Sequence, residues 1–240
     1  MSNPVLNEKF IDRTNVLSEP VTMNGVLQKT IILFLILLAS ATFTWFKGAQ
    51  GYGDLTMMLT QGGAIVGLIL ALIICFAKAF FLIPLYAIAE GLFLGGISYI
   101  MESVFPGIVQ TAVLGTIMAI AGTLFLYSTK LIKCSEKLIS TIYVATFAIF
   151  GVYLIQIIGN FFGYSIPGLF DNGYVGIAFS VLVIGIAAFN LIVDFHFIET
   201  AVNNFAPKKY EWYFGFSLVV TVVWIYVEIL RLIAKTRSRN

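Results

Sequence analysis

Long apolar runs separated by short polar stretches dominate the chain. A helix that crosses the hydrocarbon core of a bilayer needs about 20 consecutive, mostly apolar residues. Runs that approach or exceed this length lie at residues 30–46, 62–80, 82–101, 105–129, 138–162, from 174 to beyond 194, and 212–234. We expect the sixth helix to continue toward residue 204. The pattern therefore predicts an all-α integral membrane protein with seven transmembrane helices.

The connections between these runs are short, as at 80–84 and 101–105. Helices joined by short loops pack as antiparallel neighbours. We therefore expect a single seven-helix membrane domain at residues 26–240, preceded by a polar N-terminal segment at residues 1–25. Several charged residues precede the first apolar run, so this segment does not have the pattern of a signal peptide.

Composition supports a membrane location. Hydrophobic residues make up 60% of the 240 positions and charged residues 11%, whereas soluble domains carry about 25% charged residues. So few charges cannot cover a water-exposed surface, and lipid must contact much of the molecule. The net charge of +2 gives no basic face for nucleic acid. Cys75 and Cys134, in an apolar run and a lysine-rich loop, indicate neither a disulfide nor a metal site.

The distribution of basic residues predicts the orientation, because cytoplasmic loops carry an excess of lysine and arginine. A cytoplasmic N-terminus places on the inside Lys9, Arg13, Lys29, Lys78, Lys130, Lys133, Lys137, Lys208 and Lys209. It places on the outside Lys47 and the C-terminal residues Arg231, Lys235, Arg237 and Arg239. The last group disagrees with the rule. Either the seventh helix spans and its basic tail lies outside, or it is re-entrant and returns to the inside.

Small residues recur at helix-packing spacing, as Gly63 and Gly67 in the second helix and Gly91 and Gly95 in the third. Such pairs let two helix backbones approach closely. We interpret them as packing positions.

Three carboxylates at membrane depth are the candidates for function: Glu90, Asp194 and Glu228. A charge at the bilayer centre costs about 2.5–3.5 kcal/mol on insertion scales, so such groups usually face a bundle interior and are paired. Each also has a structural interpretation. Glu90 could be a helix-end carboxylate paired with Lys78, Asp194 could lie at the membrane boundary, and Glu228 could pair with Arg231 three residues later on the same helix face.

Asp194 and Glu228 are predicted to form a gating pair between the last two helices. In two antiparallel helices, these residues lie at the same height if the turn between them is centred near residue 211. The polar segment 203–211, which is the predicted turn, has its centre near 207. The two residues would then be offset along the helix axis by several Å. Two adjacent carboxylates share one proton, and losing it would add repulsion. The pair could also bind a divalent cation, since hard cations prefer oxygen ligands. His196 could tune these acids, although we favour a polar residue near the helix end.

Several stretches resemble the transmembrane Bax inhibitor motif family. Residues 86–95 (YAIAEGLFLG) are similar to its third-helix signature, 192–198 (IVDFHFI) to its acidic sixth helix, and 224–233 (WIYVEILRLI) to its last helix. Residues 2–10 and 23–26 resemble a bacterial branch, which implies the bacterial plasma membrane. The resemblance covers nearly the whole chain. It implies two three-helix layers around a central C-terminal helix.

The resemblance also implies a pH-sensitive calcium leak gated by an acidic pair, with Asp194 and Glu228 in those positions and Glu90 as the third-helix acid. Two features depart from the family pattern. The seventh-helix acid is Glu instead of the Asp of the calcium-leak members, and the connection between the two acids looks longer. Arg231 beside Glu228 would also favour the ionised carboxylate.

The leading prediction is therefore a proton-controlled leak for cations, with calcium as the expected ion and no resident cofactor. The alternative is a non-conducting factor that binds and regulates other membrane proteins, such as quality-control proteases. An enzyme is not expected, because the chain has one histidine, no zinc-binding His-Glu-x-x-His and no Gly-x-Ser-x-Gly. A proton-coupled transporter remains an alternative without a clear inverted repeat. The lipid bilayer and a cation are the predicted partners.

Overall fold

The computed structural model describes residues 19–239, apart from residues 133 and 165. Within them lie seven long helices, each apolar enough to cross a membrane, which confirms the predicted all-α membrane fold. They are α1 (Met23–Ala49), α2 (Gly53–Ala77), α3 (Ile83–Val104), α4 (Ile108–Ser128), α5 (Glu136–Phe161), α6 (Tyr174–Asn203) and α7 (Tyr210–Arg237), with a short 3₁₀ turn, η2 (Phe80–Leu82), before α3.

The first two helices begin earlier than the apolar pattern predicts, at Met23 and Gly53. Polar residues in their first turns hide these starts from a search for apolar runs. At α1 the start is set by Thr22, whose side chain accepts a hydrogen bond from the Gly25 N–H at 2.9 Å and satisfies one of the free donors of the first turn. At the other end of α2, Lys78 takes a left-handed conformation (φ 54°) and ends the helix before η2.

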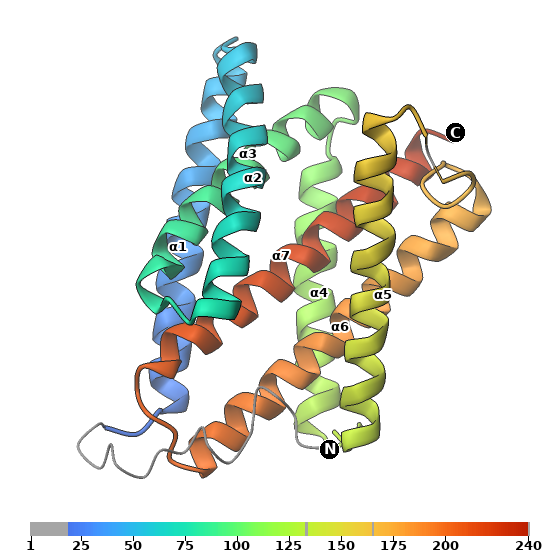
Figure 1. The fold of residues 1–240 in the computed structure, drawn as a ribbon. Helices are drawn as coiled ribbons and strands as arrows, with labels where there is room; N and C mark the ends of the chain where they lie inside the picture. Colours follow the sequence, from blue (N-terminus) through green and yellow to red (C-terminus); the bar gives the residue numbers. More distant parts are fainter. Residues whose placement is uncertain (1–18, 133, 165, 240) are drawn as a thin grey trace.

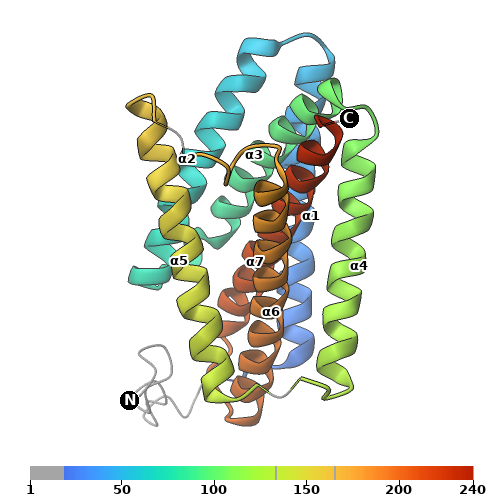
Figure 2. The same ribbon diagram turned by 90° about the vertical axis from the view of Figure 1, so that its right-hand side faces the viewer.

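The helices form two layers with α7 between them (Figures 1 and 2). Helices α1, α2 and α3 pack on one another, while α6 contacts both α4 and α5. α7 contacts α1 and α3 on one side and α4 and α6 on the other. Half of its most apolar stretch is buried, against 11% for α5. These contacts agree with the predicted arrangement of two three-helix layers around a central last helix.

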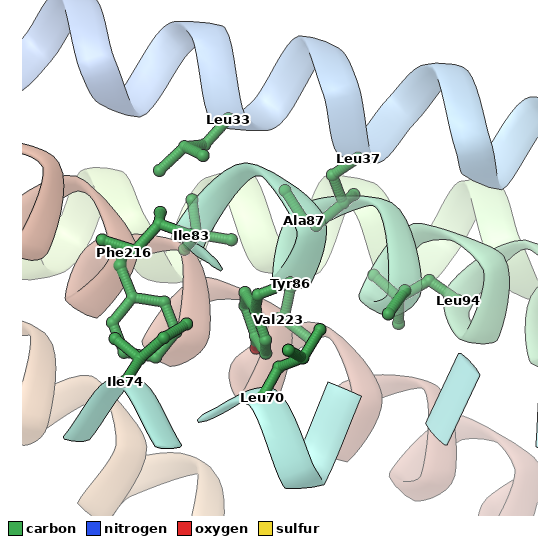
Figure 3. Packing of buried hydrophobic residues seen from close by; sticks show 12 residues of the cluster. Leu33, Leu37, Leu70, Ile74, Ile83, Tyr86, Ala87, Leu94, Phe216 and Val223 are labelled. Atoms are coloured by element: carbon green, nitrogen blue, oxygen red, sulfur yellow. The ribbon is translucent and has the colours of Figure 1, made fainter. Parts of the chain in front are cut away.

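The main hydrophobic core joins the first layer to the central helix (Figure 3). Leu33 and Leu37 of α1 face Ile83 and Ala87 of α3, and Phe216 of α7 packs at the same place. The Tyr86 ring meets the Phe216 ring edge-on, with 4.9 Å between centroids. Burial of these side chains fixes the first part of α7 against α1–α3.

Glycines permit the close packing of the first layer. A Cβ atom at Gly95 would lie 2.1 Å from the Ala41 carbonyl oxygen of α1, and one at Gly91 would lie 2.3 Å from the Leu37 oxygen. At Gly63 of α2 it would lie 2.6 Å from the Ala89 oxygen of α3. These distances support the prediction that the glycines are packing positions.

The last helix is continuous over 28 residues and ends on the side of the molecule opposite the start of α1 (Figure 1). Arg237 near its C-terminus donates to the Pro106 carbonyl oxygen in the α3–α4 connection at 2.7 Å, whereas its first turn lies beside the start of α1. α7 therefore passes through the whole bundle, which argues against the re-entrant alternative.

Candidate functional site

Asp194 is held between α6 and α7 by two hydroxyl groups. Ser217 Oγ donates to its Oδ1 at 2.7 Å, and Thr221 Oγ1 donates to its Oδ2 at 2.6 Å. Residues 217 and 221 are four apart, so both hydroxyls lie on the face of α7 that meets α6. Each carboxylate oxygen thus receives one hydrogen bond, and the side chain ties α6 to the central helix.

Glu228 has a separate set of partners. Its side chain is only 1% exposed. Its Oε1 accepts from Arg231 Nη1 and from the Tyr153 hydroxyl of α5, both at 2.6 Å. The Arg231 guanidinium also lies 4.9 Å from the centre of the Tyr153 ring. Glu228 Oε2 is buried and has no hydrogen-bond partner among the described residues. The pairing with Arg231 within one helix, considered from the sequence, is confirmed.

The predicted contact between Asp194 and Glu228 is wrong. Asp194 is level with residues 217–221 of α7, and Glu228 lies seven residues beyond Thr221, about 10 Å along the helix at 1.5 Å per residue. The reason is the α6–α7 turn. α6 ends at Asn203 and α7 begins at Tyr210, so the turn is centred near 207 and brings residue 194 opposite about 220. These two carboxylates therefore share no proton here and do not converge on one cation.

Glu90 lies in a third place, between α2 and α3. A Cβ atom at Gly67 of α2 would lie 2.9 Å from Glu90 Oε2, so the glycine leaves room for the carboxylate. The side chain is half-buried. Lys78 is exposed at the end of α2. Among the described residues, no group of three or more acidic, histidine or cysteine side chains is arranged to hold a metal ion.

His196 follows Asp194 by two residues on α6, and side chains at this spacing do not face each other. It is half-buried, and its ring lies 6.1 Å from that of Phe197. This geometry does not place the imidazole beside the Asp194 carboxylate.

Glu211 is a buried carboxylate at the end of the bundle where α1 begins. It was not identified as a candidate from the sequence. Glu211, in the first turn of α7, is 2% exposed. It accepts from the Thr22 N–H at 3.2 Å and from the Thr22 hydroxyl at 3.1 Å. A Cβ atom at Gly25 would lie 1.9 Å from its Oε1, so Gly25 makes space for it. Glu211 thus places a negative charge at the positive end of the α1 dipole.

Residues 19–22, which we call the N-terminal strap, lie along the α6–α7 turn. The Val21 N–H donates to the Ala206 oxygen at 2.7 Å, and the Lys208 N–H donates to the Glu19 oxygen at 2.9 Å. The Lys208 ammonium also pairs with the Glu19 carboxylate. No sequence signal pointed to these contacts, because the strap and the turn are nearly 190 residues apart.

A seven-helix bundle with a buried central last helix and carboxylates held in its interior defines a multi-pass helical membrane protein. The model of the Bax inhibitor 1 like family matches residues 3–238, nearly the full chain, and the protein belongs to this family. The resemblance noted in the sequence is therefore confirmed. No curated protein and no solved structure matches the chain.

Proposed function

We propose that this protein is a proton-controlled leak for cations, with calcium as the expected ion, and that Asp194 is its proton-responsive group. The observation that carries the proposal is the pair of hydroxyl groups on α7 that donate to Asp194 of α6. Because α7 lies between the two layers, a change in its contact with α6 would be transmitted to both.

The chemistry gives the proposal a direction. The ionised Asp194 carboxylate accepts from both Ser217 and Thr221, and hydrogen bonds to a charged group are worth about 1.5–3 kcal/mol against 0.5–1.5 for neutral ones. A proton on one carboxylate oxygen turns that oxygen into a donor, so one hydroxyl must turn away or reverse. Protonation therefore loosens the α6–α7 contact, and the proposed leak increases at acidic pH.

The same three side chains are suitable as transient cation ligands. One carboxylate and two hydroxyls present oxygen atoms, which calcium prefers. Glu228 is less suitable, because the Arg231 guanidinium already neutralises it at 2.6 Å. We therefore assign the responsive role to Asp194 and not to the two acids together.

Calcium flux into proteoliposomes between pH 5 and 8 tests the proposal. The parent should pass calcium faster at low pH. Asp194→Asn should abolish the pH dependence, and Ser217→Ala with Thr221→Ala should reduce it. Glu228→Gln is the matched control, since it makes the same chemical change on α7 away from Asp194, and it should keep the pH response.

Two results would count against the proposal in different ways. Flux that keeps its pH dependence in Asp194→Asn would leave a leak but remove Asp194 from its control. A parent that passes no calcium at any pH would favour the second candidate, a non-conducting factor that binds other membrane proteins.

We also propose that the end of the bundle where α1 begins faces the cytoplasm. Lys29, Lys78, Lys130, Lys137, Lys208 and Lys209 lie at or near the helix termini of this end, as the positive-inside rule requires. The basic residues of the opposite end have structural contacts. Lys235 donates to the Gly176 oxygen at 2.9 Å, and the Arg239 guanidinium lies 3.7 Å from the centre of the Tyr174 ring. The test is a reporter enzyme that is active only outside the cytoplasm. It should be active when it is fused to the C-terminus.

A further inference from the structure

A pocket opens at the end of the bundle where α2 passes into α3 and α7 begins. Its walls come from η2, the first turn of α3, the residue just before α7 and the first turn of α7: Phe80, Phe81, Pro84, Lys209 and Trp212. The pocket has a volume of about 250 Å³. Pockets that enclose a whole drug-sized molecule have volumes of about 300–1,000 Å³. This one therefore suits part of a molecule whose remainder lies outside.

The apolar wall is held in place by aromatic packing. The Phe80 ring lies 5.5 Å from that of Tyr210 and 5.7 Å from that of Tyr213, so η2 is fixed against the start of α7. Phe81 is different, since 82% of its surface is exposed. An exposed apolar ring of this size is available to contact an apolar ligand such as an acyl chain.

One lysine lines the pocket, and a second lies over the ring that forms one of its walls. Lys209 lines it directly. The Lys29 ammonium of α1 lies 5.0 Å from the centre of the Trp212 ring, which forms another wall. Two acids of this end that the structure describes have other partners, because Glu211 accepts from Thr22 and Glu19 pairs with Lys208. Cationic charge therefore remains at the mouth of an otherwise apolar pocket.

We propose that this pocket binds one anionic phospholipid. Its phosphate group would lie between Lys209 and Lys29, and its glycerol and upper acyl chains would lie along Phe81 and Pro84. The occupant must be charged at one end and apolar at the other, and the pocket lies where the ends of spanning helices meet the headgroup region. An anionic lipid in the adjoining leaflet meets both conditions, and a neutral lipid meets only the second.

The two lysines set the expected size of the effect. One lysine near an anionic lipid surface contributes about 1 kcal/mol, which is about a fivefold change in binding. Lys209→Gln should therefore weaken phosphatidylglycerol binding about fivefold, and Lys209→Gln with Lys29→Gln about 25-fold. Binding of phosphatidylcholine should hardly change. Phe81→Ala should weaken both lipids, because it removes apolar contact area.

Native mass spectrometry of the full-length protein, titrated separately with phosphatidylglycerol and phosphatidylcholine, measures these affinities. Lys47→Gln is a matched control at the opposite end, where the Lys47 ammonium lies 5.1 Å from the centre of the Tyr52 ring. Lys130→Gln is a second control, at the same end but outside the pocket. Both should retain the parent's preference for phosphatidylglycerol.

Equal binding of the two lipids by the parent would overturn the proposal. So would a loss in Lys130→Gln as large as that in Lys209→Gln, because the lipid would then respond to the general charge of this face. The thermal midpoint of each variant without added lipid shows whether it is folded. A variant that unfolds is replaced by Lys209→Arg, which should retain binding.

Discussion

Arg231→Met should destabilise the protein strongly, because it leaves a carboxylate alone in the interior. Glu228 is 1% exposed, and two of its close donors are Arg231 Nη1 and the Tyr153 hydroxyl. Methionine has a similar length and fills the same space, so the substitution removes the charge with little loss of packing. The remaining carboxylate would then rely on the Tyr153 hydroxyl.

The expected cost follows from burial. Removing one partner of a buried ion pair costs about 3–5 kcal/mol, whereas replacing both by apolar residues is often nearly neutral. The Arg231 side chain is 36% exposed, so solvent screens part of the interaction, and the Tyr153 hydroxyl still donates. We therefore expect about 3 kcal/mol, the lower end of that range. Glu228→Met with Arg231→Met should cost only about 1 kcal/mol, for the lost tyrosine hydrogen bond.

Unfolding in mixed detergent micelles with increasing dodecyl sulfate, followed by tryptophan fluorescence, measures these changes. Trp224, one helical turn before Glu228, reports on this part of α7. Arg237→Met is the matched control, since Arg237 is an exposed arginine on the same helix, and it should cost less than about 1 kcal/mol. If the double variant is less stable than Arg231→Met alone, Glu228 is not an uncompensated buried charge and the reasoning fails.

Further predictions concern packing, helix capping and pH. Gly95→Ala should lower stability by about 1–3 kcal/mol through overpacking, whereas Gly122→Ala, with open space at its Cβ, should not; thermal unfolding compares them. Thr22→Val removes the α1 cap and the hydroxyl bond to the buried Glu211, and should cost about 1–2 kcal/mol in the same assay. Lys208 lowers the pKa of Glu19, and Glu19 raises that of Lys208. Their pair therefore stabilises the strap at neutral pH, and this stabilisation declines as the pH falls below 4.5 or rises above 10.5. Hydrogen exchange at the Lys208 amide, compared with Glu19→Gln, detects the change.

Helix number and the glycine contacts could be predicted from the sequence, because both depend on local composition. Apolar runs of about 20 residues are imposed by bilayer thickness, and glycines four residues apart mark one helix face. The starts of α1 and α2 could not be found in this way. They lie in polar turns, where the cap of Thr22 and not hydrophobicity sets the boundary.

The three membrane carboxylates could also be found from the sequence, but their partners could not all be assigned. The Glu228–Arg231 pair is local and was visible at spacing i,i+3. The partners of Asp194 depend on the register of α6 against α7, which the centre of the turn near 207 determines. The mismatch of several Å noted in the sequence was therefore the correct signal, since a turn centred near 207 brings residue 194 opposite about 220. Tyr153 on α5 gave no signal because its contact depends on tertiary packing.

In the proposed mechanism, two hydroxyls and not a second acid lie opposite Asp194, and this reverses the expected direction of the pH response. In an acidic pair the helices repel each other when the shared proton leaves, so such a pair loosens as pH rises. Here the ionised form of Asp194 accepts hydrogen bonds from both Ser217 and Thr221. Exchanging two charge-assisted bonds for neutral ones weakens the α6–α7 contact by about 2 kcal/mol, or roughly 30-fold, on protonation. The sign of the pH dependence therefore distinguishes the two mechanisms, and Ser217→Asp should shift the response toward that of an acidic pair.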